Sequence, residues 1–172
     1  MTTYSLRDIL LSFADKKGNK RILFNPGALG GINVNLIKIS LLLLPFIEYA
    51  LIFNPVVFNY LGIATAIVFF IVFLSIVMLI VFFVTWGVKK RVIKKITPSW
   101  NHYFKGKDIL AVLSSGVTPY SDFFQHYAEI LTQNLSEDEM YKALLNAFIV
   151  MEEENKDLIS AMNRNNKLEN RH

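Results

Sequence analysis

Cysteine is absent from these 172 residues, and histidine is scarce, with only His102, His126 and His172. Without cysteine the chain forms no disulfide, holds no thiolate-ligated metal and offers no cysteine nucleophile. No histidine stands at a metal-ligand spacing from another histidine or from a carboxylate. A P-loop and a Gly-x-Ser-x-Gly nucleophile motif are also missing. We therefore expect a protein that is not an enzyme, with no catalytic residues, no metal site and no cofactor.

Charge is missing from a second place, the longest apolar stretch of the chain. Two apolar runs, 36–57 and 61–86, are separated by Asn59 and Tyr60, and the second run contains no charged residue. A bilayer core of about 30 Å needs roughly 20 apolar residues of helix, and each run is that long. Apolar residues occur all round the second helix rather than on one stripe. The pattern predicts a transmembrane hairpin rather than two core helices of a soluble protein.

The first of these helices carries one acidic residue, Glu48. An ionised carboxylate inside a membrane costs several kcal/mol, so Glu48 is protonated, paired, or turned toward protein or water. A hairpin folded about residues 57–58 would bring Glu48 close to Thr65 and Ser40 beside Ser75. Both pairs would form interhelical hydrogen bonds worth about 1 kcal/mol each. The alternative is a proton- or ion-handling carboxylate at the centre of an oligomer.

Positive charge gathers directly after the second apolar run, at Lys89, Lys90, Arg91, Lys94 and Lys95. Cytoplasmic flanks of membrane helices are enriched in Lys and Arg. We therefore expect a protein of the bacterial inner membrane with both termini in the cytoplasm. Beside a membrane helix, the expected partner of such a cluster is anionic lipid rather than nucleic acid.

Residues 4–15 have the pattern of a short amphipathic helix. Ser5 and Asp8 resemble a capping box, and apolar residues recur at helical spacing from Leu6 to Phe13. The apolar face would lie either on the membrane surface or against the C-terminal part of the chain.

The C-terminal part predicts a small bundle of three or four helices. Ser136 and Glu139 form a capping box, and apolar stripes include Phe124, Leu131, Leu144 and Phe148. The expected fold class is an all-α membrane protein, a two-helix hairpin plus a cytoplasmic helical bundle. The predicted segments are an N-terminal amphipathic segment (1–32), the hairpin (33–88), a basic linker (89–107) and the helical domain (108–172).

The stretches "DILAVLSSGVTPYSDFFQHYAEIL" and "YKALLNAFIVMEEENKDLISAM" follow the basic segment. This order resembles the second cytoplasmic domain of the type II secretion F and type IV pilus inner-membrane platform family. The matching positions run from Leu110 to Pro119 and from Leu158 to Met162. The family's third membrane helix and first full cytoplasmic domain have no counterpart here. The resemblance implies a helical bundle that holds an assembly together and engages a cytoplasmic ATPase.

We therefore expect a structural or scaffold subunit of a secretion, pilus or conjugation machine. It would oligomerise, contact other membrane subunits and bind a cytoplasmic protein, with Glu152, Glu153 and Glu154 as the docking surface. Two alternatives remain, a proton- or ion-conducting or motor-type subunit that uses Glu48, and a secreted hairpin effector that presents its tails to the cytosol.

Overall fold

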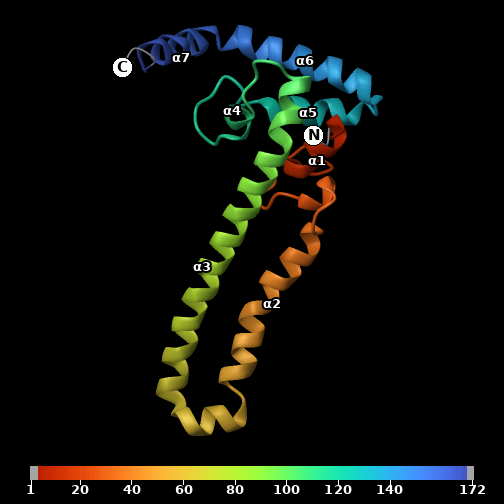
Figure 1. Cartoon of the computed structure of the whole chain (residues 1–172). Coiled ribbons are helices and arrows are strands. Elements are labelled where there is room, and N and C mark those ends of the chain that lie inside the picture. Colours follow the sequence, from red (N-terminus) through yellow and green to blue (C-terminus); the bar gives the residue numbers. More distant parts are fainter. Residues whose placement is uncertain (1–3, 170–172) are drawn as a thin grey trace. The chain divides into compact units, whose positions relative to one another are not determined.

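The computed structural model describes residues 4–169, and every element in that range is a helix (Figure 1). No strand occurs there, only an isolated antiparallel bridge between Ala14 and Lys20. The elements are α1 (Leu6–Phe13), the short 3-10 helix η1 (Pro26–Leu29), α2 (Val34–Ile52), α3 (Pro55–Tyr103), α4 (Ile109–Leu113), α5 (Phe123–Thr132), α6 (Glu137–Glu154) and α7 (Lys156–Glu169).

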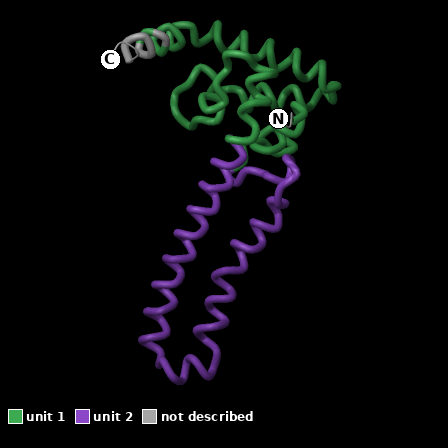
Figure 2. The backbone as a smooth tube through the Cα atoms, in the orientation of Figure 1, with its two compact units in different colours: residues 1–21, 94–172 green, residues 22–93 purple. Residues whose placement is uncertain are grey.

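The chain divides into two compact units, shown in different colours in Figure 2. Unit 1 comprises residues 1–21 and 94–172, and unit 2 comprises residues 22–93. This division differs from the predicted one, because residues 4–21 of the N-terminal segment pack with the C-terminal helices rather than forming a part of their own. The boundary also falls inside α3, whose first part belongs to unit 2 and whose last part belongs to unit 1.

Unit 2 is a helical hairpin whose two helices run antiparallel (Figure 2). The predicted reversal at residues 57–58 is wrong, because α2 already ends at Ile52 and the next helix starts at Pro55. Asn54 then starts the next helix, since its side chain accepts the Val56 N–H at 3.0 Å and a proline follows it at the first helical position. The chain turns again at Gly62, with φ of 71° and ψ of 162°, a conformation that favours glycine. A short helix, 55–61, therefore forms the tip of the hairpin.

After Gly62, α3 continues without a break to Tyr103. Residues 89–103 are therefore helix and not the linker that the sequence predicts. Pro98 stands inside this helix although it lacks an N–H and cannot donate to the preceding turn. The neighbouring Ile96 and Trp100 are fully buried in unit 1, and this burial of apolar surface offsets the lost hydrogen bond.

Both hairpin helices are long and apolar enough to cross a membrane. The most apolar 18-residue segment of each helix is almost entirely exposed. Of this segment, 6% is buried in α2 and none in α3. A core helix of a soluble protein would be mostly buried, so these two helices have no such role in unit 2. The two helices contact each other near the tip through aromatic rings, where Phe70 meets Tyr49 and Phe53 at centroid distances of 6.2 and 5.8 Å.

In unit 1, α1 is part of the core. Its apolar face, Leu6, Ile9, Leu10 and Phe13, is fully buried. Of the two predicted positions for this helix, the structure therefore has the one against the C-terminal helices. Its first turn is fixed from two sides, because the Ser5 side chain accepts the Asp8 N–H and Glu137 Oε1 accepts the Leu6 N–H at 2.8 Å.

Aromatic rings fill the centre of unit 1. Trp100 contacts Phe104 at a centroid distance of 4.6 Å and meets Phe13, Phe123 and Phe148 at 6.1 Å each. These distances suit edge-to-face and offset packing. The Trp100 indole N–H donates to the Lys107 carbonyl at 2.7 Å, so the one polar atom of this ring is satisfied. Residues from α1, α3, α5 and α6 thus share one core.

Of the two predicted apolar stripes in this core, the one on α6 is confirmed and the one on α5 is displaced. On α6 the predicted Leu144 and Phe148 are fully buried. On α5 the buried face is Phe123, Tyr127 and Ile130, while Phe124 and Leu131 are half-buried. The stripe on α5 is therefore displaced by one residue, because Phe123 packs on Trp100 and Phe148 and sets the rotation of the helix.

A tight turn between α1 and residue 21 packs on α5. Gly18 has φ of +86°, and a Cβ atom at this position would lie 2.5 Å from the Ala128 Cα atom. Both the backbone conformation and the close approach therefore require glycine. The Asp15 side chain accepts the N–H groups of Lys17 and Asn19 in the same turn. Burial raises the pKa of Asp15, but the hydrogen bonds with Asn19 and Lys17 and the charge of Arg21 together outweigh it and lower the pKa overall.

Candidate functional site

Glu48 lies one turn before the end of α2 and is 9% exposed. Counted along the helix at 1.5 Å per residue, it is about 6 Å from the tip end and about 21 Å from the start of α2. The predicted reversal at residues 57–58 would have placed it farther from the tip, at about 14 Å. Both carboxylate oxygens are buried and have no hydrogen-bond partner among the described residues. The predicted bond to Thr65 is not formed, and Thr65 is exposed.

The predicted pair of Ser40 and Ser75 is not formed either. Ser75 donates its hydroxyl to the Ile71 carbonyl of its own helix at 2.9 Å, and Ser40 is exposed. The predicted register assumed a reversal at residues 57–58, whereas the chain makes this reversal in two turns, one at Asn54 and one at Gly62. The intermediate helix changes which residues of α2 and α3 lie at the same level.

The five predicted basic residues all lie on α3. In unit 2, the Lys89 ammonium lies over the Phe24 ring at 6.0 Å and the Lys90 ammonium over the Trp86 ring at 5.1 Å, both within cation–π range. Arg91 is exposed, as are Lys94 and Lys95 in unit 1. Within the described residues none of the five forms an ion pair with a carboxylate.

Glu152, predicted as part of a docking surface, is bound inside unit 1. Its Oε1 atom accepts hydrogen bonds from the Lys107 ammonium and, at 2.7 Å, from the Tyr120 hydroxyl. Partial burial opposes ionisation, but these two hydrogen bonds and the Lys107 charge outweigh it and lower the pKa of Glu152. Burial and the same hydrogen bond raise the pKa of Tyr120. Glu152 therefore ties the segments on both sides of α4 to α6.

The other two predicted docking residues face solvent. Glu153 pairs with Lys156 one turn later at 3.2 Å, and both side chains are about three-quarters exposed. An exposed pair of this kind contributes little to stability. Glu154 is exposed. Only Glu153 and Glu154 remain from the predicted acidic surface.

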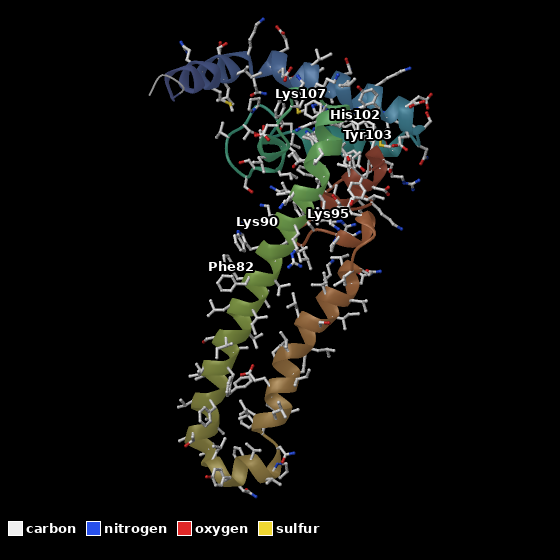
Figure 3. All side chains as sticks on the ribbon, in the orientation of Figure 1. Phe82, Lys90, Lys95, His102, Tyr103 and Lys107 are labelled. Carbon is white, nitrogen blue, oxygen red and sulfur yellow. The ribbon has the colours of Figure 1, made fainter. Side chains whose placement is uncertain are left out.

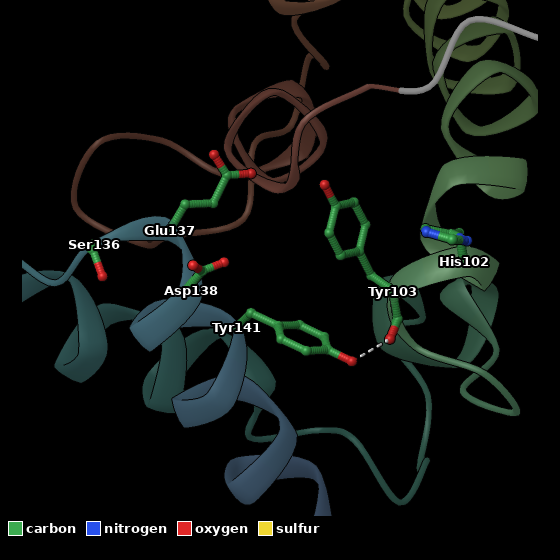
Figure 4. A pocket seen from close by; sticks show the side chains of 6 residues that line it. All are labelled: His102, Tyr103, Ser136, Glu137, Asp138 and Tyr141. Atoms are coloured by element: carbon green, nitrogen blue, oxygen red, sulfur yellow. Dashed lines mark hydrogen bonds between the residues drawn. The ribbon is translucent and has the colours of Figure 1, made fainter.

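Unit 1 has two grooves that the sequence analysis did not predict. The first, of about 490 Å³, is lined by His102, Tyr103, Ser136, Glu137, Asp138 and Tyr141 (Figure 4). The Tyr141 hydroxyl donates to the Tyr103 carbonyl at 3.2 Å across it. One Glu137 oxygen is already bound to α1. The polar groups of this groove thus mainly join α3, α6 and α1 to one another.

The second groove, of about 580 Å³, lies between α1, α5 and α6. Its lining includes the apolar side chains Ile130, Leu131 and Met140 and the exposed cations Arg7 and Lys16. Tyr127 also lines it; burial raises the pKa of Tyr127 to about 12, although Arg7 opposes this effect and Asp15 adds to it. The only indication of this groove in the sequence was the polar face of α1, to which the sequence analysis gave no role.

Polar side chains line both grooves. No group of three or more His, Asp or Glu side chains that could hold a metal ion occurs in the part of the chain that the structure describes. His126 lies 4.0 Å from Glu129 on the same exposed helix face, and no serine is hydrogen-bonded to a histidine among the described residues.

Comparisons of this chain with protein-family models, with curated proteins and with solved structures find no match.

Proposed function

We propose that the protein is a non-enzymatic scaffold subunit of a bacterial inner membrane. The hairpin of unit 2 anchors the chain in the bilayer, both termini lie in the cytoplasm, and unit 1 binds a cytoplasmic protein. The resemblance of residues 108–162 to the platform family supports a place in a secretion, pilus or conjugation machine.

The observation that carries this proposal is the exposed apolar surface of unit 2. Between Leu36 and Trp86, 26 large hydrophobic side chains are exposed. Leaving one such side chain in water rather than burying it costs about 1.5–3 kcal/mol, so the whole surface would cost tens of kcal/mol. A folded domain has a net stability of only about 5–15 kcal/mol. These side chains must therefore be shielded from water. A lipid bilayer shields a helix on all sides, which suits helices whose apolar residues occur all round.

The ends of the hairpin support its orientation. The basic residues of unit 2, Lys38 and Lys89 to Arg91, lie near the start of α2 and the end of the unit 2 part of α3. The tip has uncharged polar residues, Asn54 and Asn59, and an exposed Tyr60. Basic residues favour the cytoplasmic side, and tyrosine favours a membrane interface. We infer that the tip lies at the opposite surface.

The partner would bind unit 1 at the groove between α1, α5 and α6. This groove combines the apolar side chains Ile130, Leu131 and Met140 with the cations Arg7 and Lys16, neither of which forms an ion pair among the described residues. Interfaces of stable complexes combine apolar and polar residues in this way.

The test is to isolate the full chain from its native membranes in a mild detergent. We expect a complex larger than the monomer. Leu131→Glu places a charge in the groove and should release the partner, whereas Val117→Glu, at a site 87% exposed and outside the groove, should leave the complex intact. Recovery of the wild-type chain only as a monomer would count against the scaffold function.

The unpartnered carboxylate of Glu48 favours a second candidate, a proton- or ion-conducting oligomer. Conduction would need Glu48 to exchange a proton or to attract a cation with its negative charge, and glutamine has neither a titratable proton nor a charge. An ion or proton flux that is the same for wild type and Glu48→Gln in proteoliposomes would refute this candidate.

A further inference from the structure

An apolar stripe on α3 leads directly to the basic residues of unit 2. Met78, Phe82, Trp86 and Lys90 follow one another at every fourth position, so they share one face of the helix. The first three are among the exposed side chains, and Figure 3 shows Phe82 and Lys90 projecting from the same side of α3. A shallow groove of about 400 Å³ follows this stripe, lined also by Val81, Thr85 and Lys89.

The dimensions of the stripe match one leaflet of a bilayer. Eight residues separate Met78 from Trp86, which is about 12 Å of helix. Half of a hydrocarbon core is about 15 Å. If an acyl chain lies along this stripe, the end that is attached to the headgroup is near Trp86. The next turn of the helix is then level with the headgroup.

That next turn holds two cations in defined positions. Phe24 lies below the Lys89 ammonium and Trp86 below the Lys90 ammonium. Ring contacts restrict the two side chains but leave their N–H donors free for an anion. Glu48 is the only acidic residue of unit 2, and it is 41 positions before Lys89, close to the tip. Within unit 2, no described carboxylate compensates the positive charge of these two lysines.

We propose that this face of α3 binds one anionic phospholipid. The phosphate group contacts Lys89 and Lys90, and an acyl chain lies along Met78, Phe82 and Trp86. The inference rests on the proposed insertion of the hairpin in a membrane. It adds to that function a defined site with a preference for negative headgroups.

The preference has an expected size. A lysine near an anionic surface favours an anionic lipid about five-fold, so two lysines together give a preference of up to about 25-fold at low salt. Trp86 lies within the site and reports on its occupant. The other tryptophan, Trp100, is fully buried in unit 1 and adds a constant background.

The experiment uses the full chain in vesicles that contain phospholipids with brominated acyl chains, which quench tryptophan fluorescence on contact. One series contains brominated phosphatidylglycerol and the other brominated phosphatidylcholine at the same mole fraction. From the quenching of Trp86, we expect an apparent affinity for phosphatidylglycerol that is about 5- to 25-fold higher than that for phosphatidylcholine. The fluorescence intensity in each series is divided by the intensity in vesicles of the same composition without bromine. Differences in the intrinsic fluorescence of Trp86 between variants then cancel.

The double variant Lys89→Gln/Lys90→Gln should lose this preference, with a ratio near one. Lys105→Gln/Lys142→Gln removes the same charge from exposed positions of unit 1 and should keep the wild-type ratio. Equal quenching by the two lipids in the wild type, or an unchanged preference in Lys89→Gln/Lys90→Gln, would overturn the site while leaving the hairpin inserted. Absence of quenching by either lipid would instead refute membrane insertion itself. Quenching by phosphatidylcholine that matches the wild type shows that a variant is inserted and folded.

Discussion

Gly18 offers a sharp test of the packing of the N-terminal segment in unit 1. Its backbone has φ of +86°, and an added Cβ would lie 2.5 Å from the Ala128 Cα and 2.8 Å from the Ala128 Cβ of α5. Gly106 has nearly the same backbone conformation, with φ of +78°, but a Cβ there meets nothing within 4 Å. The pair separates backbone strain from steric overlap.

The magnitudes follow from these two environments. A left-handed conformation costs a non-glycine residue about 1–2 kcal/mol, and both Gly18→Ala and Gly106→Ala carry this cost. Overpacking adds about 1–3 kcal/mol in Gly18→Ala alone, because the overlap is with backbone atoms that cannot rotate away. We expect Gly18→Ala to lower the free energy of unfolding of unit 1 by about 2–5 kcal/mol, and Gly106→Ala by about 1–2 kcal/mol.

Urea unfolding of the full chain in detergent micelles measures this difference. Trp100 fluorescence reports on unit 1, since this ring is at the centre of the aromatic core, and Trp86→Phe removes the other tryptophan. Equal losses of stability in the two alanine variants would refute the packing of the turn on α5, and with it the assignment of the N-terminal segment to unit 1.

Two further predictions concern single carboxylates. Glu152→Gln should lower the stability of unit 1 at neutral pH by about 1–2 kcal/mol, because it weakens hydrogen bonds to a charged acceptor. The pKa of Glu152 is lowered in the folded state, so its contribution is present above the ordinary value of 4.5 and is lost as the pH falls through the folded-state pKa. Acid titration of the unfolding midpoint should therefore show a smaller loss in Glu152→Gln than in the wild type, and identical profiles would contradict the network with Lys107 and Tyr120. Glu48→Leu should favour insertion of α2 by about 1–3 kcal/mol in a glycosylation-based insertion assay, since it removes an unpartnered carboxylate from the hairpin. Less efficient insertion would show that Glu48 has a partner in the membrane.

Local patterns in the sequence were sufficient for much of the fold. The apolar face of α1 follows from its helical spacing, and the capping box of α6 is formed, with the Ser136 N–H donating to Glu139 at 3.0 Å. The two apolar helices of unit 2 follow from the length of their runs. Each of these features depends on residues within one or two turns of each other.

Features that depend on distant residues were missed. The continuation of α3 through Pro98 depends on the burial of Trp100 against α1, α5 and α6. The partners of Glu152 are 45 and 32 positions away in the sequence, so the local pattern indicated only an acidic docking surface. The positions of the two turns in the hairpin depend on Asn54 and Gly62, whose effects compete with the other turn-forming residues nearby.

The central claim, a hairpin that crosses the membrane with both ends in the cytoplasm, is tested most directly by labelling single cysteines in intact cells. The chain has no cysteine of its own, so each introduced thiol is the only target. With a membrane-impermeant maleimide added from outside, Asn59→Cys at the tip should be labelled, whereas Ser115→Cys in unit 1 should react only after the membrane is opened. Ser75→Cys, in the middle of α3, should react only after denaturation. Labelling of Ser75→Cys in intact or opened membranes, or protection of Asn59→Cys from the outside, would contradict the account.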